Sequence, residues 1–430
     1  MHTIDLSMEK ITKVEGSASL DLKVRDGKVT QVHFGIQDYK RFYTNAMAGK
    51  PIAALPQLLS RICGTCSNAH ILCSLKACED ALKIEPTETT RLLRTLTSYG
   101  LMIRDHALHL YLFALPDLYN KDAFLDFDEN DEEQHQLLHD GFDIKAAGNF
   151  LATLVAGRSI HATHPTIGGF LDFPDPAGIE EAIRKLEDIR PAVRRLVDVF
   201  LKCHFHLDRE TKYMALVQKD RFGFLEGEVV SSIGERIAPR DFRAHLEQVV
   251  LPYSQASAYQ YSGEPYLVGA LARLNLAAGS LHPKTIKTLT PTLKLFPSTN
   301  IFHNNLAQAI EILHCVDDAL EILQTAKFEQ EPVITKKPAA GIGIGVIEAP
   351  RGTLYHLVEI DGKGTVVRGE VIVPTGQNQR NIEEDIKRKV EELLPETTKP
   401  EIEHEIEKII RAYDPCMSCG AHFLKVKWSE

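Results

Sequence analysis

The sequence has no long uninterrupted apolar run. Its most apolar stretch, residues 101–116, is broken by Arg104, Asp105 and His106, so it falls short of the roughly 20 apolar residues that cross a bilayer. The N-terminus lacks the basic segment followed by an apolar segment that marks a secretory signal. Lys and Arg form no cluster that could follow a phosphate backbone, and the formal net charge is −10, which argues against nucleic acid as a partner. These absences predict a cytoplasmic protein without a membrane span.

Internal repeats, low-complexity tracts and linkers rich in Gly and Ser are absent as well. With 44% hydrophobic and 25% charged residues over 430 positions, the composition is that of an ordinary globular chain. One domain is the simplest interpretation. By pattern it has an N-terminal β-rich part (1–52), a helical body (53–330), a C-terminal α+β part (331–422) and a C-terminal extension (423–430).

The hydrophobic pattern places short strands at both ends of the chain and helices between them. An Asp26-Gly27 turn between runs of alternating polarity predicts a hairpin within residues 3–36, and Asp361-Gly362 marks a second hairpin within 353–373. Helical periodicity predicts helices over the following segments: 53–60, 69–84, 88–115, 131–157, 178–215, 239–247, 254–276, 301–327, 381–396 and 400–412. The predicted fold class is therefore mainly α with peripheral β (α+β).

Four of the eight cysteines form two Cys-x-x-Cys pairs, Cys63/Cys66 and Cys416/Cys419. Thiolates at this spacing can hold one metal ion, and four soft sulfurs suit zinc, iron–sulfur or nickel chemistry. A structural zinc site usually closes its ligands within a few tens of residues, whereas these pairs lie near opposite ends of the chain. A deep active centre is the favoured hypothesis, and spacing alone leaves a structural zinc site and thioredoxin-like redox pairs open.

Three other patterns are informative without any metal. Asp105 lies in a helix that is apolar almost all round, where an unpaired carboxylate is costly, so it must meet a cation or a donor. A structural ion pair is one interpretation of it. The Gly341-x-Gly343-x-Gly345 run lacks the Lys-Ser/Thr and the following helix of a phosphate loop. The remaining cysteines are expected to be buried packing residues: Cys73, Cys78, Cys203 and Cys315.

The segments around the two cysteine pairs carry a specific resemblance. Arg61-Ile-Cys-Gly-Thr-Cys-Ser-Asn-Ala-His70 and Asp414-Pro-Cys-Met-Ser-Cys-Gly-Ala-His422 resemble the two metal-binding signatures of the large subunit of nickel–iron hydrogenases, most of all those of the cytosolic bidirectional group. Further family-like segments occur in the same order: Lys13–Gly16, Arg104–His106, Gly157–His161, Gly168–Phe170, Glu348–Gly352 and Pro374–Asn378. The resemblance spans nearly the whole chain and implies the large-subunit fold, with a helical-bundle core.

The resemblance implies a catalytic centre that oxidises H2 reversibly to protons and electrons. In the family, four cysteines hold nickel, and the second cysteine of each pair also binds an iron that carries carbon monoxide and cyanide. Carried over to this sequence, Cys63 and Cys416 are the terminal nickel ligands, and Cys66 and Cys419 bridge nickel and iron.

The resemblance also implies roles for the side chains around this centre. Cys416 takes the proton when H2 is split, and Glu15 relays it, which requires a carboxylate within hydrogen-bond reach. Arg351 polarises H2 over the open metal site, and Asp105 orients its guanidinium. The outer positions are implied as follows: Pro350 and Thr375 beside the diatomic ligands of iron, His70 near a bridging sulfur, and Asp414 beside Arg351.

Two features of the sequence bear on magnesium and on maturation. Many family members bind magnesium near the C-terminal His, here His422, with the help of a Glu that Thr44 replaces in this sequence. A hydroxyl is a weaker ligand for a hard cation than a carboxylate, so the sequence disfavours magnesium there. Residues 423–430 continue past His422, which resembles a precursor awaiting a maturation chaperone and a C-terminal endopeptidase.

The sequence offers no further set of cluster cysteines, so electrons must leave through a partner. The resemblance implies an iron–sulfur small subunit and, beyond it, subunits that bind flavin, NAD(P) or another carrier. Two alternatives stay open. One is an H2-sensing regulatory protein built on the same centre, and the other is a structural protein with a four-cysteine zinc site.

Overall fold

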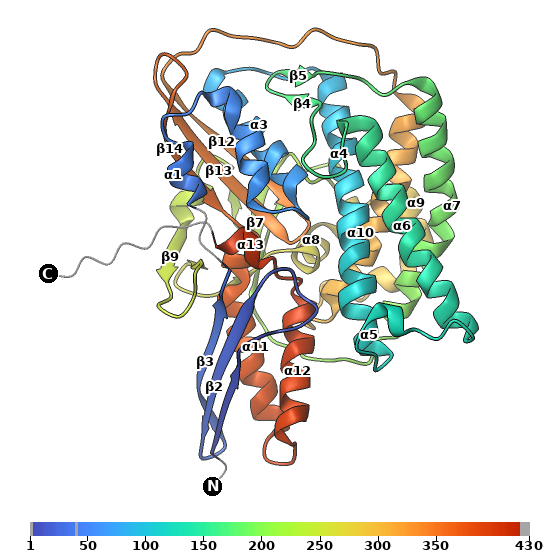
Figure 1. The fold of residues 1–430 in the computed structure, drawn as a ribbon, viewed down its shortest axis with the longest axis vertical. Helices are drawn as coiled ribbons and strands as arrows, with labels where there is room; N and C mark the ends of the chain where they lie inside the picture. Colours follow the sequence, from blue (N-terminus) through green and yellow to red (C-terminus); the bar gives the residue numbers. More distant parts are fainter. Residues whose placement is uncertain (1–2, 39–41, 422–430) are drawn as a thin grey trace, which may run out of the picture.

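A computed structural model describes residues 3–38 and 42–421. The long helices lie together at the right of Figure 1, a helix-covered sheet lies at the upper left, and a hairpin with two helices extends downward. The prediction of a mainly α fold with peripheral β structure is confirmed. His422 and the extension 423–430 lie outside the described residues, so these two predictions are not tested.

Four long helices form a bundle that contains the largest apolar core. Thr87, Asp131 and Asp175 each accept a hydrogen bond from a backbone N–H of the first turn and so begin three of these helices. One long helix continues through a π-helical turn (Leu108–Ala114) into a short one. The helices of this part are α4 (Glu88–Ala107), α5 (Leu115–Leu118), α6 (Glu132–Ala156), α7 (Pro176–Leu201), α8 (Ala270–Ala277), α9 (Pro283–Leu293) and α10 (His303–Thr325).

A three-stranded antiparallel sheet packs closely against helix α3 (Ser67–Leu82). The glycine run that the sequence rejects as a phosphate loop lies in its first strand. A Cβ on Gly343 would come 1.9 Å from the carbonyl oxygen of Ala77, and one on Gly345 would come 2.2 Å from that of Cys73. These glycines therefore allow the backbones of strand and helix to touch. The elements here are α1 (Tyr43–Met47), α2 (Leu55–Leu59), β12 (Gly341–Ala349), β13 (Gly352–Ile360) and β14 (Val366–Ile372).

The third part joins the N-terminal sheet to the C-terminal helices around a second apolar core. Asp26 and Gly27 both have positive φ, as the two-residue hairpin turn requires, so the predicted hairpin is confirmed. The second predicted hairpin is also present, between β13 and β14. The elements of this part are β1 (Ile4–Met8), β2 (Ala18–Arg25), β3 (Lys28–Ile36), α11 (Pro374–Leu393), α12 (Lys399–Ala412) and α13 (Met417–Gly420).

Three predicted helices between residues 178 and 276 are wrong in part. The helix predicted over 178–215 ends at Leu201, the segment 239–247 runs into a strand, and 254–276 is helical only after Gly269. Short apolar runs fit strand and helix equally well, and Val and Tyr favour strands here. The strands are β4 (Pro165–Thr166), β5 (Gly169–Phe170), β6 (Lys212–Val217), β7 (Glu228–Ser231), β8 (Arg236–Ile237), β9 (Leu246–Val250), β10 (Ser257–Tyr261) and β11 (Tyr266–Leu267).

No helix within the described ranges combines the length and the apolar character that a membrane crossing requires. The division of the chain at residues 52, 330 and 422 stays a prediction. Helix α13 lies at the centre of Figure 1, close to where the three parts meet, and the site is built there.

Candidate metal centre

The first cysteine pair lies at the start of α3. Cys63 has an extended backbone after a short 3-10 turn, and Cys66 is the N-cap residue of the helix. His70 lies one turn further on, and its backbone N–H donates to the Cys66 carbonyl. Strand β12 packs closely against α3. The start of α3, with its cysteine pair, is therefore held in place by the sheet.

The second pair lies at helix α13, with Cys416 as its N-cap residue and Cys419 within it, and it is anchored by the opposite end of the chain. Residues Glu15 and Cys416 form an isolated parallel β-bridge, and the Met417 N–H donates to the Glu15 carbonyl at 3.0 Å. The Cys416 N–H donates to the Thr375 hydroxyl at 2.9 Å. Asp414 has a φ of 49°, a left-handed turn that directs the chain from α12 to the cysteines.

The four cysteine sulfurs converge in one buried cluster, as the sequence predicts. The Sγ atoms of Cys63 and Cys416 lie 3.3 Å apart, and that of Cys419 lies 3.0 Å from both Cys66 and Cys416. All four sulfurs lie within 4.8 Å of one another. The chain therefore presents four sulfur ligands to a single point, a donor set that fits a soft metal ion.

The pKa values of these thiols differ, and this bears on whether the cluster needs a bound cation. Hydrogen bonds from Cys416 and its neighbours hold the pKa of Cys63 well below its ordinary value, whereas burial raises the pKa of Cys416 and Cys419 well above it. Several thiolates cannot be buried together without a compensating charge. The cluster therefore needs a metal ion if all of its sulfurs are to ionise.

The Glu15 carboxylate contacts the cluster directly. Its Oε2 accepts a hydrogen bond from the Cys416 thiol at 3.0 Å, and its Oε1 accepts one from the Ser418 hydroxyl at 2.6 Å. Burial raises the pKa of Glu15. The Ser418 hydroxyl also lies 2.9 Å from Asp38 Oδ2, and Asp38 is partly exposed. A line of polar groups thus runs from the thiol toward solvent, and sequence reasoning missed Ser418 and Asp38 because neither belongs to a pattern of charged residues.

The guanidinium of Arg351 also lies near the cluster, in the lining of a cavity that it shares with Cys66, Cys416 and Cys419. Arg351 stands in the tight turn between β12 and β13. One nitrogen donates to Asp105 at 2.7 Å, and the other lies 2.9 Å from Asp414 as an ion pair without hydrogen-bond alignment. The predicted pairing of Asp105 with Arg351 is thus present. Its Nε and that second nitrogen have no hydrogen-bond partner among the described residues.

A small cavity is lined both by Arg351 and by three of the four cysteines. The His70 ring lies beside it, with Nε2 3.6 Å from the Cys419 sulfur and Nδ1 3.2 Å from His356. The cavity is lined by Cys66, His70, Ala349, Pro350, Arg351, Leu354, Pro374, Thr375, Cys416 and Cys419. The structure thus brings every predicted site residue that it describes to one place, except Thr44.

Thr44 lies in α1, and its predicted companion His422 is outside the described residues. The remaining cysteines hold no second cluster within the described chain. Cys73, Cys78 and Cys315 are buried, as predicted, and burial raises the pKa of Cys78 to about 12. Cys203 is only half-buried, because α7 ends before it.

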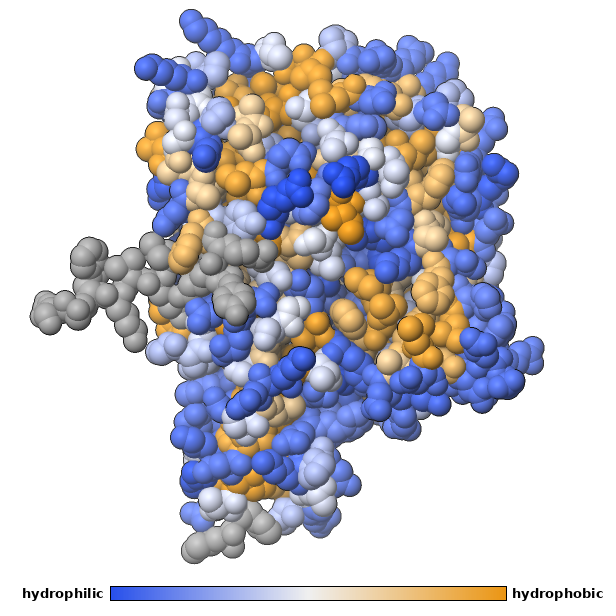
Figure 2. All heavy atoms as spheres, viewed as in Figure 1, coloured by the Kyte–Doolittle hydropathy of each residue, from blue (hydrophilic) through white to orange (hydrophobic). Residues whose placement is uncertain are grey.

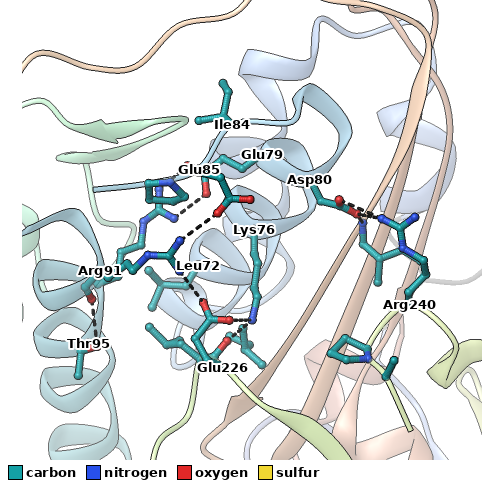
Figure 3. Close-up of a pocket in the computed structure, with 17 residues that line it drawn as sticks. Leu72, Lys76, Glu79, Asp80, Ile84, Glu85, Arg91, Thr95, Glu226 and Arg240 are labelled. Carbon is teal, nitrogen blue, oxygen red and sulfur yellow. Dashed lines mark hydrogen bonds and ion pairs between the residues drawn. The ribbon is translucent and has the colours of Figure 1, made fainter. Parts of the chain in front are cut away.

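A surface cavity of about 370 Å³ lies on the outer side of α3 (Figure 3). Its charged groups are already paired with one another: Lys76 lies 2.9 Å from Glu226, and Arg240 lies 3.1 Å from Asp80. The charges of this surface cavity are therefore neutralised by one another, whereas the Nε of Arg351 beside the cysteines has no hydrogen-bond partner among the described residues.

Comparison with known proteins agrees with this geometry. A family model described as nickel-dependent hydrogenase matches residues 44–145 and 238–422. The chain is 31% identical over 423 residues to the sulfhydrogenase 2 subunit alpha of Pyrococcus furiosus, covering 98% of this chain and 100% of that protein. It is 29% identical over 429 residues to the sulfhydrogenase 1 subunit alpha of the same organism, covering 98% and 99%.

The fold matches a solved structure equally completely. An NAD+-reducing nickel–iron hydrogenase in the H2-reduced state superposes with a TM-score of 0.86 at 24% identity, covering 98% of this chain and 100% of the other. At this identity the match speaks for the fold alone.

Proposed function

The chain belongs to the nickel-dependent hydrogenase family and is an oxidoreductase that acts on H2, and from this premise we propose that it is the catalytic subunit that splits H2 heterolytically and reversibly. The observation that carries the proposal is that Glu15 contacts Cys416 of the cluster directly, while Arg351 lines a cavity together with Cys66, Cys416 and Cys419. A proton acceptor and a fixed cation thus lie beside the same cluster. Family membership removes the alternative of a structural zinc protein.

The cluster fits the metal centre of this family. We infer that Cys63, Cys66, Cys416 and Cys419 hold nickel, and that Cys66 and Cys419 also hold an iron with carbon monoxide and cyanide ligands. When bound, this group supplies the site for H2 and the exchange of two electrons. The Thr375 hydroxyl accepts from the Cys416 N–H, so its own hydrogen is available to donate to a cyanide, and Pro350 lines the same cavity.

Cys416 and Glu15 form the proton route in this proposal. The Cys416 thiol already donates to the carboxylate at 3.0 Å, within the reach that proton transfer needs. Burial raises the pKa of Glu15. The carboxyl group therefore holds a proton received from Cys416 more readily than an exposed Glu would. Ser418 holds the other oxygen of Glu15 at 2.6 Å and so keeps the carboxylate facing the thiol.

Arg351 supplies a permanent positive charge above the cysteines. A guanidinium stays protonated at any working pH, and Asp105 and Asp414 hold it from behind. Arg351 lines the cavity, and its Nε has no hydrogen-bond partner among the described residues, so the guanidinium keeps a donor for a molecule bound there. A fixed donor in a water-poor cavity stabilises charge that develops when H2 is polarised.

Electrons leave the subunit through partners. The described residues contain no second metal-ligand cluster, so we propose an iron–sulfur small subunit, with flavin-, NAD(P)- or other carrier-binding subunits beyond it. Figure 2 shows apolar groups gathered over the long helices, and Leu125 and Phe142 in this part of the chain are exposed, as an interface requires. A maturation chaperone and an endopeptidase complete the proposed partners, and we place the assembly in the cytoplasm.

The test is infrared spectroscopy with metal analysis on the protein purified with its native partners. We expect carbon monoxide and cyanide bands, nickel and iron near one each per chain, and H2-dependent reduction of a dye. Zinc in place of these metals in a mature sample would sink the proposal. A complete centre that barely turns over H2 would favour the H2-sensing alternative.

A further inference from the structure

A second buried arginine, Arg273 of α8, lies behind the turn that carries Arg351. Its side chain is 2% exposed. It contacts two carboxylates, Glu311 of α10 and Glu348 at the end of β12. Nothing in the sequence pattern marks this residue, because it belongs to an ordinary helix almost eighty positions before the turn.

Each of the five N–H donors of Arg273 has its own acceptor. Nε and one NH2 hydrogen bind the Glu311 carboxylate at 2.6 and 2.7 Å, and one NH1 hydrogen binds Glu348 at 2.7 Å. The remaining two donate to the carbonyls of Ala349 and Pro350 at 3.1 and 3.0 Å. A guanidinium has five donors in one plane, so this arrangement is complete.

The two carbonyls belong to the residues directly before Arg351. Ala349 pairs with Gly352 across the ladder, whereas Pro350 lies in the turn itself. A buried carbonyl without a partner is costly, so the bond from Arg273 matters most at Pro350. The carboxylate of Glu348 is held in turn by the Leu216 N–H and the Thr353 hydroxyl, both at 2.7 Å. Arg273 thus ties the turn to the helical bundle through Glu311.

The start of α8 reinforces this tie. Gly269 precedes the helix with a φ of 128°, and a Cβ on it would lie 3.2 Å from the Arg351 carbonyl. A Cβ on Gly352 would lie 2.6 Å from the Val268 side chain. The backbone of the turn is therefore packed directly against the helix that carries Arg273.

We propose that Arg273 is a positioning residue of the H2-splitting site, which fixes the Pro350–Arg351 turn and thereby the direction of the Arg351 guanidinium. The proposal rests on the function proposed above for that site. Arg273 itself does not line the cavity over the cysteines. Its effect passes through the backbone of the turn.

The first test uses the full chain without metal, so it does not depend on turnover. We expect Arg273→Lys to raise hydrogen exchange in peptides that cover residues 346–354, because lysine offers three donors from one point and leaves a turn carbonyl unpaired. The matched control is Arg94→Lys, since Arg94 is also buried and binds one carboxylate, Glu79, through two nitrogens. Equal exchange in this segment for wild type and Arg273→Lys, or the same increase in both variants, would overturn the proposal.

The second test uses the holoenzyme. Arg273→Lys should lower kcat roughly 10- to 100-fold, the usual range for residues behind a metal site, with the KM for H2 and the metal content unchanged. In an Arg351→Lys background the same substitution should cost nothing further, because the two act through one group. Full additivity would contradict the proposal.

A milder variant covers the case in which Arg273→Lys does not fold. Glu311→Gln keeps the shape of the carboxylate and removes one acceptor, so it should raise exchange in 346–354 by a smaller amount. Absence of any H2 turnover in the loaded wild type would refute the proposed function, whereas the exchange measurement would still decide the role of Arg273 in the turn.

Discussion

The turn between β12 and β13 separates two buried arginines whose surroundings differ. Behind the turn, Arg273 has an acceptor for every N–H. In front of it, Arg351 is 4% exposed, yet two of its nitrogens have no hydrogen-bond partner among the described residues. An unpaired buried donor costs stability, and Arg94 and Arg104 also keep an Nε without a hydrogen-bond partner among these residues. What sets Arg351 apart is that it also lines the cavity beside the cysteines, whereas Arg273 does not.

The helical bundle resembles the region behind the turn. Arg190 donates twice to Asp317 and once to Thr288, and Asp317 also accepts from Thr285 at 2.8 Å. Asp317 is fully buried in this network, and the Arg190 side chain is 19% exposed. The contrast predicts that substitutions in front of the turn reduce activity, whereas those in the bundle reduce stability.

The largest loss of activity is expected on substitution of Glu15, whose carboxylate contacts the Cys416 thiol. Glu15→Gln keeps the shape and removes the proton acceptor, so H2-dependent dye reduction should fall by about 10²- to 10⁴-fold. Nickel and iron content should stay the same. Glu235→Gln, at an exposed position, is the control. Retention of more than half of the activity would remove Glu15 from the proton route.

Arg351→Lys is the next in size and tests the spare donors. Lysine keeps the charge but cannot reach Asp105 and Asp414 while also presenting free donors. Turnover should fall by about 10²- to 10³-fold at unchanged nickel and iron content. An equally active variant would show that charge alone suffices and that the unpaired nitrogens have no role.

Arg190→Lys should give the reverse result. Loss of one or two charge-assisted hydrogen bonds to the buried Asp317 should reduce the free energy of unfolding by about 1–3 kcal/mol, measured by urea titration. The kcat of the folded enzyme should stay within about twofold, since nothing in the bundle network touches the cavity. A large loss of kcat at full metal content would break the comparison between the two regions.

The smallest effect concerns His314, also in the bundle. Burial lowers its pKa to about 4, so the unfolded chain binds a proton more readily than the folded one below pH 6.5. Stability from this group is complete above pH 6.5 and is lost as the pH falls toward 4. At pH 5 the loss should be about 2 kcal/mol. The stability difference between wild type and His314→Gln should shrink by this amount between pH 7 and pH 5, and a constant difference would refute it.

Local patterns predicted much of the molecule. Asp26-Gly27 fixed the hairpin, because only a few residue types adopt its backbone angles, and long periodic segments located α4, α6 and α10. The two cysteine pairs pointed to one buried centre, and the buried position of Asp105 predicted a cation or a donor beside it, since an isolated carboxylate is too costly in a core. The resemblance then supplied Glu15 and Arg351 as neighbours, and the structure places both at the cluster.

Features that depend on distant contacts could not be predicted. The strands between residues 212 and 267 are too short for their periodicity to distinguish them from helices, and their partners decide the outcome. Arg273 and Ser418 acquire their importance only from what folds against them. The same applies to Gly343 and Gly345, whose meaning lies in the approach of α3 rather than in the glycine pattern.

The bridge between Glu15 and Cys416 joins two residues that the ribosome makes at very different times. These residues are 401 positions apart, and at about 5–20 residues per second a ribosome needs at least about 20 s to make the second after the first. Cys63 and Cys66 follow soon after Glu15 in the sequence, so this pair exists for most of that interval. Each new chain therefore offers half of its centre to the cell before the other half exists.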